Sequence, residues 1–233
     1  MSKREIPDKG TDLQNRKKKK LKKLICWLAI DLSVAFIVFA LLLYKPSQYN
    51  PVFVETDEIS SSLLKLYSVI HDKSQLNDPF EIVVTQDALK DIINLADWPM
   101  ESEGVLLYSP DALIDPNFIV LMGTADFQGM EFIITIELQA KINEQGLMDI
   151  NVSKIKVGAV NVTPLAKITA QKMYKQKLEE IGDIDLYSWQ AKIAASLLTD
   201  EAIEPVFEIE NQTLKVEKIT IDEGRLTINL LPI

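Results

Sequence analysis

The sequence predicts an α+β protein in which one N-terminal transmembrane helix precedes a curved, mostly antiparallel sheet packed against a few helices. Three observations lead to this prediction. An apolar segment of 21 residues, 24–44, contains a single charged residue. Apolar and polar residues alternate over residues 131–142, the period of a β-strand with one wet face. Residues 163–182 and 188–200 instead carry apolar residues at helical spacing.

The apolar segment is long enough to cross a membrane. A helix rises about 1.5 Å per residue, so residues 24–44 span the roughly 30 Å hydrocarbon core. Thirteen Leu, Ile, Val and Phe residues in it favour insertion by about 0.3–0.6 kcal/mol each, which outweighs about 3 kcal/mol for Asp31. A cleaved signal peptide is the alternative. We expect an uncleaved anchor, because the apolar core is longer than in signal peptides and no A-x-A pattern follows it.

The charge distribution predicts the orientation of the chain. Residues 1–23 contain ten Lys or Arg and three acidic residues, whereas residues 45–233 contain fifteen and thirty. Positive flanks stay inside, so we expect a cytoplasmic basic tail at 1–23 and an extracytoplasmic main domain, in a single-pass cell-membrane protein. The acidic domain would repel the phosphates of nucleic acids, which excludes them as partners. Cys26 is the only cysteine, so the outer domain has no disulfide framework.

The residues after the membrane begin with a proline-containing segment. Residues 45–56, with Pro46 and Pro51, predict a short stiff stalk, and residues 57–233 predict the extracytoplasmic α+β domain. Residues 57–72 are expected to form a helix and 79–84 a strand, after which Thr85 caps a second helix. Residues 97–117 contain three prolines and are predicted to be irregular, apart from a strand at 105–108.

Long strands follow, at 117–127, 131–142 and 147–162, and further strands close the chain. In two of them the apolar alternation slips by one residue, near Ser153–Lys154 and near Glu217–Lys218. A slip of one residue predicts a β-bulge, which bends and twists a sheet. Between these strand groups lie the two predicted helices, the first with Thr163 as its N-cap and Pro164 at its first position.

Motifs for covalent chemistry are absent from the sequence. It contains no G-x-S-x-G, no glycine loop for phosphate and no H-E-x-x-H. His71 is the only histidine, so neither a triad nor a histidine metal cluster can form. Asp183 and Asp185 have a spacing that metal sites use, but a solvated turn explains them better. We therefore predict a protein that is not an enzyme and has no metal site and no cofactor.

Asp31 is the one charged residue within the apolar segment. In one interpretation it contacts a partner helix, either of another membrane protein or of a second copy of this chain. In the other it lies near the inner end of the helix and draws water or headgroups towards itself. The sequence does not decide between them.

Three stretches carry a resemblance to a known family. They are PFEIVVTQDALKDIIN (79–94), IVLMGTADFQGMEFIITIELQAKINEQGLMDINVSKIKVGAVNVTP (119–164) and VEKITIDEGRLTINL (216–230). Together with the N-terminal span, they resemble the YpmS-like family of bacterial membrane-anchored extracytoplasmic proteins of unknown function. The rhythm of strands and helices is also similar to that of tubular lipid-binding domains. This second resemblance implies a long apolar groove between sheet and helix, with membrane lipids as partners.

The groove expected from the resemblance has candidate lining residues. They are the inward set of one strand, facing residues of the next and two residues of a helix: Phe132, Ile134, Ile136, Leu138, Met148, Ile150, Val152, Met173 and Tyr174. Core packing is the alternative explanation for each of them. Two hypotheses on function follow. The domain binds a lipid-like ligand in such a groove, or it is an envelope scaffold for protein partners with a solid core.

Overall fold

The computed structural model describes residues 9–51, 61–76, 78–102, 104–180, 189–209 and 212–233. The chain divides into two compact units, Met1–Leu42 and Leu43–Ile233. The first unit contains α1 (Lys9–Leu42), so the basic run and the apolar segment form one continuous helix. Its part from Ile25 to Leu42 is long and apolar enough to cross a membrane, and none of it is buried. This helix is consistent with a membrane anchor or a signal sequence.

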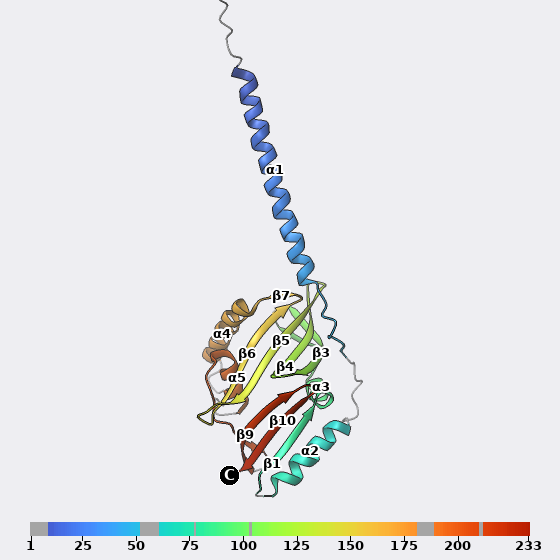
Figure 1. The fold of residues 1–233 in the computed structure, drawn as a ribbon, viewed down its shortest axis with the longest axis vertical. Coiled ribbons are helices and arrows are strands. Elements are labelled where there is room, and N and C mark those ends of the chain that lie inside the picture. Colours follow the sequence, from blue (N-terminus) through green and yellow to red (C-terminus); the bar gives the residue numbers. More distant parts are fainter. Residues whose placement is uncertain (1–8, 52–60, 77, 103, 181–188, 210–211) are drawn as a thin grey trace, which may run out of the picture. The chain divides into compact units, whose positions relative to one another are not determined.

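The second unit contains four more described helices and two antiparallel sheets, which confirms the predicted α+β class (Figure 1). Its helices are α2 (Ser61–Ser74), α3 (Gln86–Asn94), α4 (Thr163–Glu180) and α5 (Trp189–Thr199). Its strands are β1 (Phe80–Thr85), β2 (Met100–Ser102), β3 (Val105–Asp115), β4 (Phe118–Phe127), β5 (Met130–Ile142), β6 (Met148–Val157), β7 (Val160–Asn161), β8 (Val206–Ile209), β9 (Gln212–Asp222) and β10 (Arg225–Pro232). The strands therefore form two sheets, where the sequence had suggested one.

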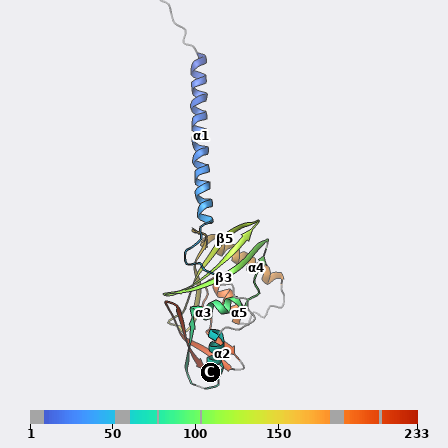
Figure 2. The same cartoon turned by 90° about the vertical axis from the view of Figure 1, so that its right-hand side faces the viewer.

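The six-stranded sheet is a meander in the order β2-β3-β4-β5-β6-β7. Neighbouring strands are joined by short turns, which is why they pair antiparallel in chain order. The β4–β5 turn illustrates this, because Gln128 and Gly129 both have positive φ, 56° and 81°, as a two-residue hairpin turn requires. The sheet is strongly twisted, as β3 and β5 show in the turned view of Figure 2.

The four-stranded sheet has the order β1-β10-β9-β8 and carries the largest buried apolar cluster of the described residues. It brings the start of the domain beside the end of the chain, since β1 pairs with β10 along its whole length. Helices α2 and α3 pack against this sheet. The buried members of the cluster are Ile82, Val84, Ala88, Leu214, Val216 and Leu230.

Both predicted β-bulges are confirmed. In the β5–β6 pair, Glu137 lies opposite Lys154 and Leu138 opposite Val152, so Ser153 is the extra residue. In the β9–β10 pair, Asn229 lies opposite Lys218 and Leu230 opposite Val216, with Glu217 between them. The predicted cap is also confirmed, because the Thr85 side chain accepts a hydrogen bond from the N–H of Ala88.

Two local predictions differ from the structure. The strand expected at 105–108 continues to Asp115. A bulge at Ser109 and Pro110 interrupts its pairing with β4, and the pairing resumes at Asp111. Proline is tolerated at such a bulge, where no ladder hydrogen bond is needed. The Thr163 hydroxyl accepts from the N–H of Ile155 in β6 at 2.8 Å, so it ties α4 to the sheet where a helix cap had been predicted.

Candidate functional site

The predicted groove residues of β5 and β6 lie on one face of the six-stranded sheet. Directly paired residues of antiparallel strands point to the same face, and Leu138 pairs with Val152. By the same rule, the face extends to β4, where Leu121 lies opposite Ile136. We call this surface the apolar face. Its members on the central strand are Phe132, Ile134, Ile136 and Leu138, and those on β6 include Met148, Ile150, Val152, Ile155 and Val157.

Most of the apolar face is half-buried. Its four members on β5 and the residues Ile150 and Val152 all keep intermediate exposure, whereas Met148 is buried at 4%. Met173 of α4 is also half-buried. The side chain of Tyr174 lies outside the described residues. The structure thus brings the strand residues together, while Met148 belongs to the packed interior.

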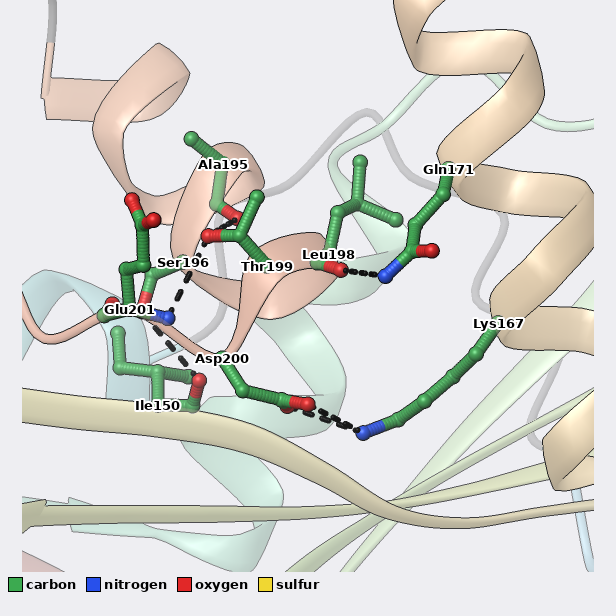
Figure 3. A network of polar contacts seen from close by, with 9 residues as sticks. All are labelled: Ile150, Lys167, Gln171, Ala195, Ser196, Leu198, Thr199, Asp200 and Glu201. Atoms are coloured by element: carbon green, nitrogen blue, oxygen red, sulfur yellow. Dashed lines mark hydrogen bonds and ion pairs between the residues drawn. The ribbon is translucent and has the colours of Figure 1, made fainter.

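Polar contacts hold α4 and α5 against β6, and Figure 3 shows them. The ammonium of Lys167 in α4 lies 2.9 Å from a carboxylate oxygen of Asp200, just after α5. The amide of Gln171 donates to the carbonyl of Leu198 at 2.7 Å. The hydroxyl of Ser196 is within 3.4 Å of the Ile150 carbonyl, and the Ile150 side chain lies on the side of β6 that faces α5 (Figure 3). The two helices therefore pack against β6, at one side of the apolar face.

The opposite face of the sheet is covered by the segment of residues 43–51, which we call the linker segment. It includes the first residues of the predicted stalk, 45–56, of which 52–56 lie outside the described residues. Tyr49 is buried at 5% exposure and packs with Val120, Met122 and Ile133. Its hydroxyl lies 2.6 Å from the carbonyl of Ser109 and 2.7 Å from the hydroxyl of Thr124. The linker segment is thus part of the domain core.

A buried carboxylate also fixes the linker segment. The Asp111 side chain is 1% exposed and lies 2.8 Å from the ammonium of Lys90 in α3. Its other oxygen accepts from the backbone N–H of Asn50 at 2.9 Å. Asp111 therefore joins β3, α3 and the linker segment at one point. Sequence reasoning missed this residue, because its partners are distant in the chain.

Beside Tyr49, the linker segment covers a cavity of about 390 Å³. Its floor is formed by Val120 and Met122 of β4 and by Thr135 of β5. The charged residues Asp115, Glu137 and Lys156 line it as well, and the linker segment contributes Tyr44, Pro46 and Gln48. None of the predicted groove residues lines this cavity. It is therefore a second candidate site, on the face opposite the apolar face.

We expect the domain to become less stable at alkaline pH, because of the hydroxyl of Tyr108 on β3. Its hydroxyl donates to Glu131 at 2.5 Å, and this hydrogen bond, with burial second, raises the pKa of Tyr108 from 10.0 to about 12. Because the unfolded chain ionises first, the stabilisation is complete below pH 10 and is lost as the pH rises towards about 12. Burial raises the pKa of Tyr49 too, so a loss of stability in this range remains without Tyr108.

Urea denaturation of the wild type and of Tyr108→Phe at about pH 9 and about pH 11 checks this prediction. We expect the stability difference between the two proteins to shrink at the higher pH. A difference that is equal at both values would contradict it.

The remaining predicted position, Asp31, is exposed on α1. Among the described residues, no group of three His, Cys, Asp or Glu side chains could hold a metal ion. Comparisons of the chain with models of protein families, with curated proteins and with solved structures find no match. What this chain does must therefore be argued from its apolar helix, its apolar face and the cavity under the linker segment.

Proposed function

We propose that the chain is a single-pass membrane protein whose Leu43–Ile233 unit lies outside the membrane and binds a lipid-like apolar ligand, without covalent chemistry. The orientation rests on the ten basic residues that precede the span and on the acidic composition after it. Membership of the YpmS-like family, which the sequence resembles, is part of this proposal. The ligand site is the apolar face.

One observation carries the proposal: the apolar side chains at the centre of the six-stranded sheet keep partial exposure. Strand β5 has a neighbour on each side, yet Ile134, Ile136 and Leu138 are only half-buried, and α4 and α5 contact β6 beside them. On the opposite face Ile133 is buried at 8%. Leaving a continuous apolar surface partly open costs about 25 cal/mol per Å². Such surfaces mark binding sites for apolar ligands or partners.

The test compares lipid bound to the wild type with lipid bound to Ile136→Trp. The full chain is purified in detergent, and its adducts are counted by native mass spectrometry and identified after solvent extraction. A bulky indole in the middle of the apolar face should reduce specific lipid adducts at least tenfold, because it occupies the surface on which the ligand would lie. Lipids around α1 are common to both proteins and cancel in the comparison.

Val83→Trp provides the matched control, since Val83 is a strand residue of the other sheet and is 39% exposed. This variant should retain the wild-type adducts. Equal lipid occupancy in the wild type and in Ile136→Trp would overturn the proposal.

A scaffold for protein partners is the second candidate function, and α2 provides the observation in its favour. Leu64 and Tyr67, one helical turn apart, are 53% and 55% exposed. A wild-type protein without lipid adducts would favour the scaffold. Crosslinking through cysteines placed at these two positions would then identify the surface in use.

A further inference from the structure

We propose that the cavity under the linker segment is a binding site for a small zwitterionic molecule that carries a primary ammonium group. This site goes beyond the proposed function, because it lies on the face of the sheet opposite the apolar face. A volume of about 390 Å³ is within the range of small-molecule pockets, roughly 300–1,000 Å³.

A buried hydroxyl without a partner is the first observation. Thr135 lines the cavity and is 6% exposed, and its hydroxyl oxygen is the one buried side-chain polar atom without a hydrogen-bond partner in the described part of the chain. Buried polar groups are nearly always satisfied, so an exception needs an explanation. The oxygen is covered by protein atoms, and rotation about χ1, between staggered rotamers, exchanges it with the threonine methyl group. A ligand with a hydrogen-bonding group would provide the missing partner.

The charges around the cavity select the chemistry of the ligand. Two carboxylates, those of Asp115 and Glu137, and one ammonium, that of Lys156, line the cavity, and the ammonium lies 2.8 Å from Glu137. No described residue provides a hydrogen bond or an ion pair to the Asp115 side chain. The carboxylates outnumber the lysine, so a simple anion is disfavoured and a cation is favoured at Asp115.

Aromatic residues and Lys156, which also line the cavity, could bind the ammonium group and the anionic group of a zwitterion. The aromatic rings of Tyr44 and Phe118 attract organic cations through their π faces. An ammonium nitrogen has three donors, which match carboxylate and hydroxyl oxygens. Lys156 retains N–H donors beyond its bond to Glu137, and these can take the anionic end of a zwitterion. An amino-phosphate or an amino-carboxylate satisfies both ends.

Two sources could supply this chemistry, the headgroup of an ethanolamine lipid or a free zwitterion. A lipid headgroup is one of the two sources because the cavity is close to the apolar span along the chain. Tyr44, which lines the cavity, is two residues after Leu42, the last residue of that span. The experiment therefore has one arm for each source.

The full chain is placed in nanodiscs in an amine-free phosphate buffer, and the melting temperature of the domain is measured. In the first arm, free O-phosphoethanolamine is titrated into phosphatidylglycerol nanodiscs, with its N-acetyl derivative as the control that lacks the ammonium. In the second arm, nanodiscs that also contain phosphatidylethanolamine replace the pure ones. Ligands that bind only the folded state raise the melting temperature.

Stabilisation by the free probe alone assigns a soluble ligand, and stabilisation in the second arm assigns the lipid headgroup. Either supports the proposal if Asp115→Asn and Thr135→Val weaken binding at least tenfold while Thr220→Val, a matched change in the other sheet, does not. Stabilisation in neither arm overturns it, as does equal stabilisation by the N-acetyl derivative. Loss of lipid adducts in Ile136→Trp is a separate result, so this proposal and the proposed function can fail independently.

Discussion

Replacing Tyr49 by alanine is expected to lower the free energy of unfolding of the Leu43–Ile233 unit by about 3–5 kcal/mol, the usual range for deleting a buried aromatic side chain. The ring is 5% exposed and packs on Val120, Met122 and Ile133. Its loss opens a cavity beneath the linker segment. The carbonyl of Ser109 and the hydroxyl of Thr124 also lose a partner.

Tyr49→Phe separates the two contributions. Phenylalanine keeps the ring but leaves the carbonyl of Ser109 and the hydroxyl of Thr124 without their partner, which costs about 1–3 kcal/mol. Urea denaturation followed by tryptophan fluorescence measures both variants. Tyr67→Ala is the control, because Tyr67 is 55% exposed on α2 and should change stability by about 0.5 kcal/mol or less. If Tyr49→Ala were as stable as Tyr67→Ala, the linker segment would not be part of the folded core.

Removing the carboxylate of Asp111 should have the next largest effect. We expect Asp111→Ala to destabilise the domain by about 3 kcal/mol, the lower end of the range for breaking a buried ion pair, because the partner Lys90 can regain some water. The Lys90 side chain is 20% exposed, against 1% for Asp111. The backbone N–H of Asn50 loses its acceptor as well.

A double-mutant cycle with Lys90→Met isolates the contribution of the ion pair. We expect the two substitutions together to destabilise by less than the sum of their separate effects, since each removes the same interaction. Asp115→Ala is the matched control on the same strand, and it should change stability by about 0.5 kcal/mol or less, since no described residue pairs with that carboxylate. Strict additivity of Asp111→Ala and Lys90→Met would show that the ion pair contributes nothing.

These two residues connect stability with the sites that we propose. Tyr49 and Asp111 hold the linker segment on the sheet, and the same segment provides Tyr44, Pro46 and Gln48 to the cavity. Variants that release the linker segment should therefore remove the binding of a zwitterion together with stability, whereas Thr135→Val should weaken binding without lowering stability. The apolar face depends on a different set of contacts, those between α4, α5 and β6.

Local patterns were sufficient to predict several elements. The apolar span, the long strand at 131–142, the cap at Thr85 and both bulges follow from neighbours in the chain. The bulges were predictable because the extra residues, Ser153 and Glu217, shift the apolar alternation by one position. That shift is visible without knowledge of the partner strand. The candidate residues Ile134, Ile136 and Leu138 were grouped on one face by the same alternation.

The continuation of β3 could not be predicted in this way. Three prolines between residues 97 and 117 argue against a strand when the segment is considered alone. Pairing with β4 overrides that local preference, because Pro110 falls in a bulge where its missing N–H costs nothing. The partition of the strands into two sheets was also hidden, since β1 and β10 pair residues as far apart in the chain as Phe80 and Leu230.

By itself, the sequence determined that this protein has a long apolar N-terminal helix and an α+β domain of alternating strands, because both depend on periodicities of a few residues. Only the tertiary structure decided which face of the sheet packs against Tyr49 and which stays half-buried. It also decided that Thr135 and Asp115 would line one cavity. The physical reason is separation along the chain: the hydroxyls of Tyr49 and Thr124 meet across 75 residues, and no local pattern records such a contact.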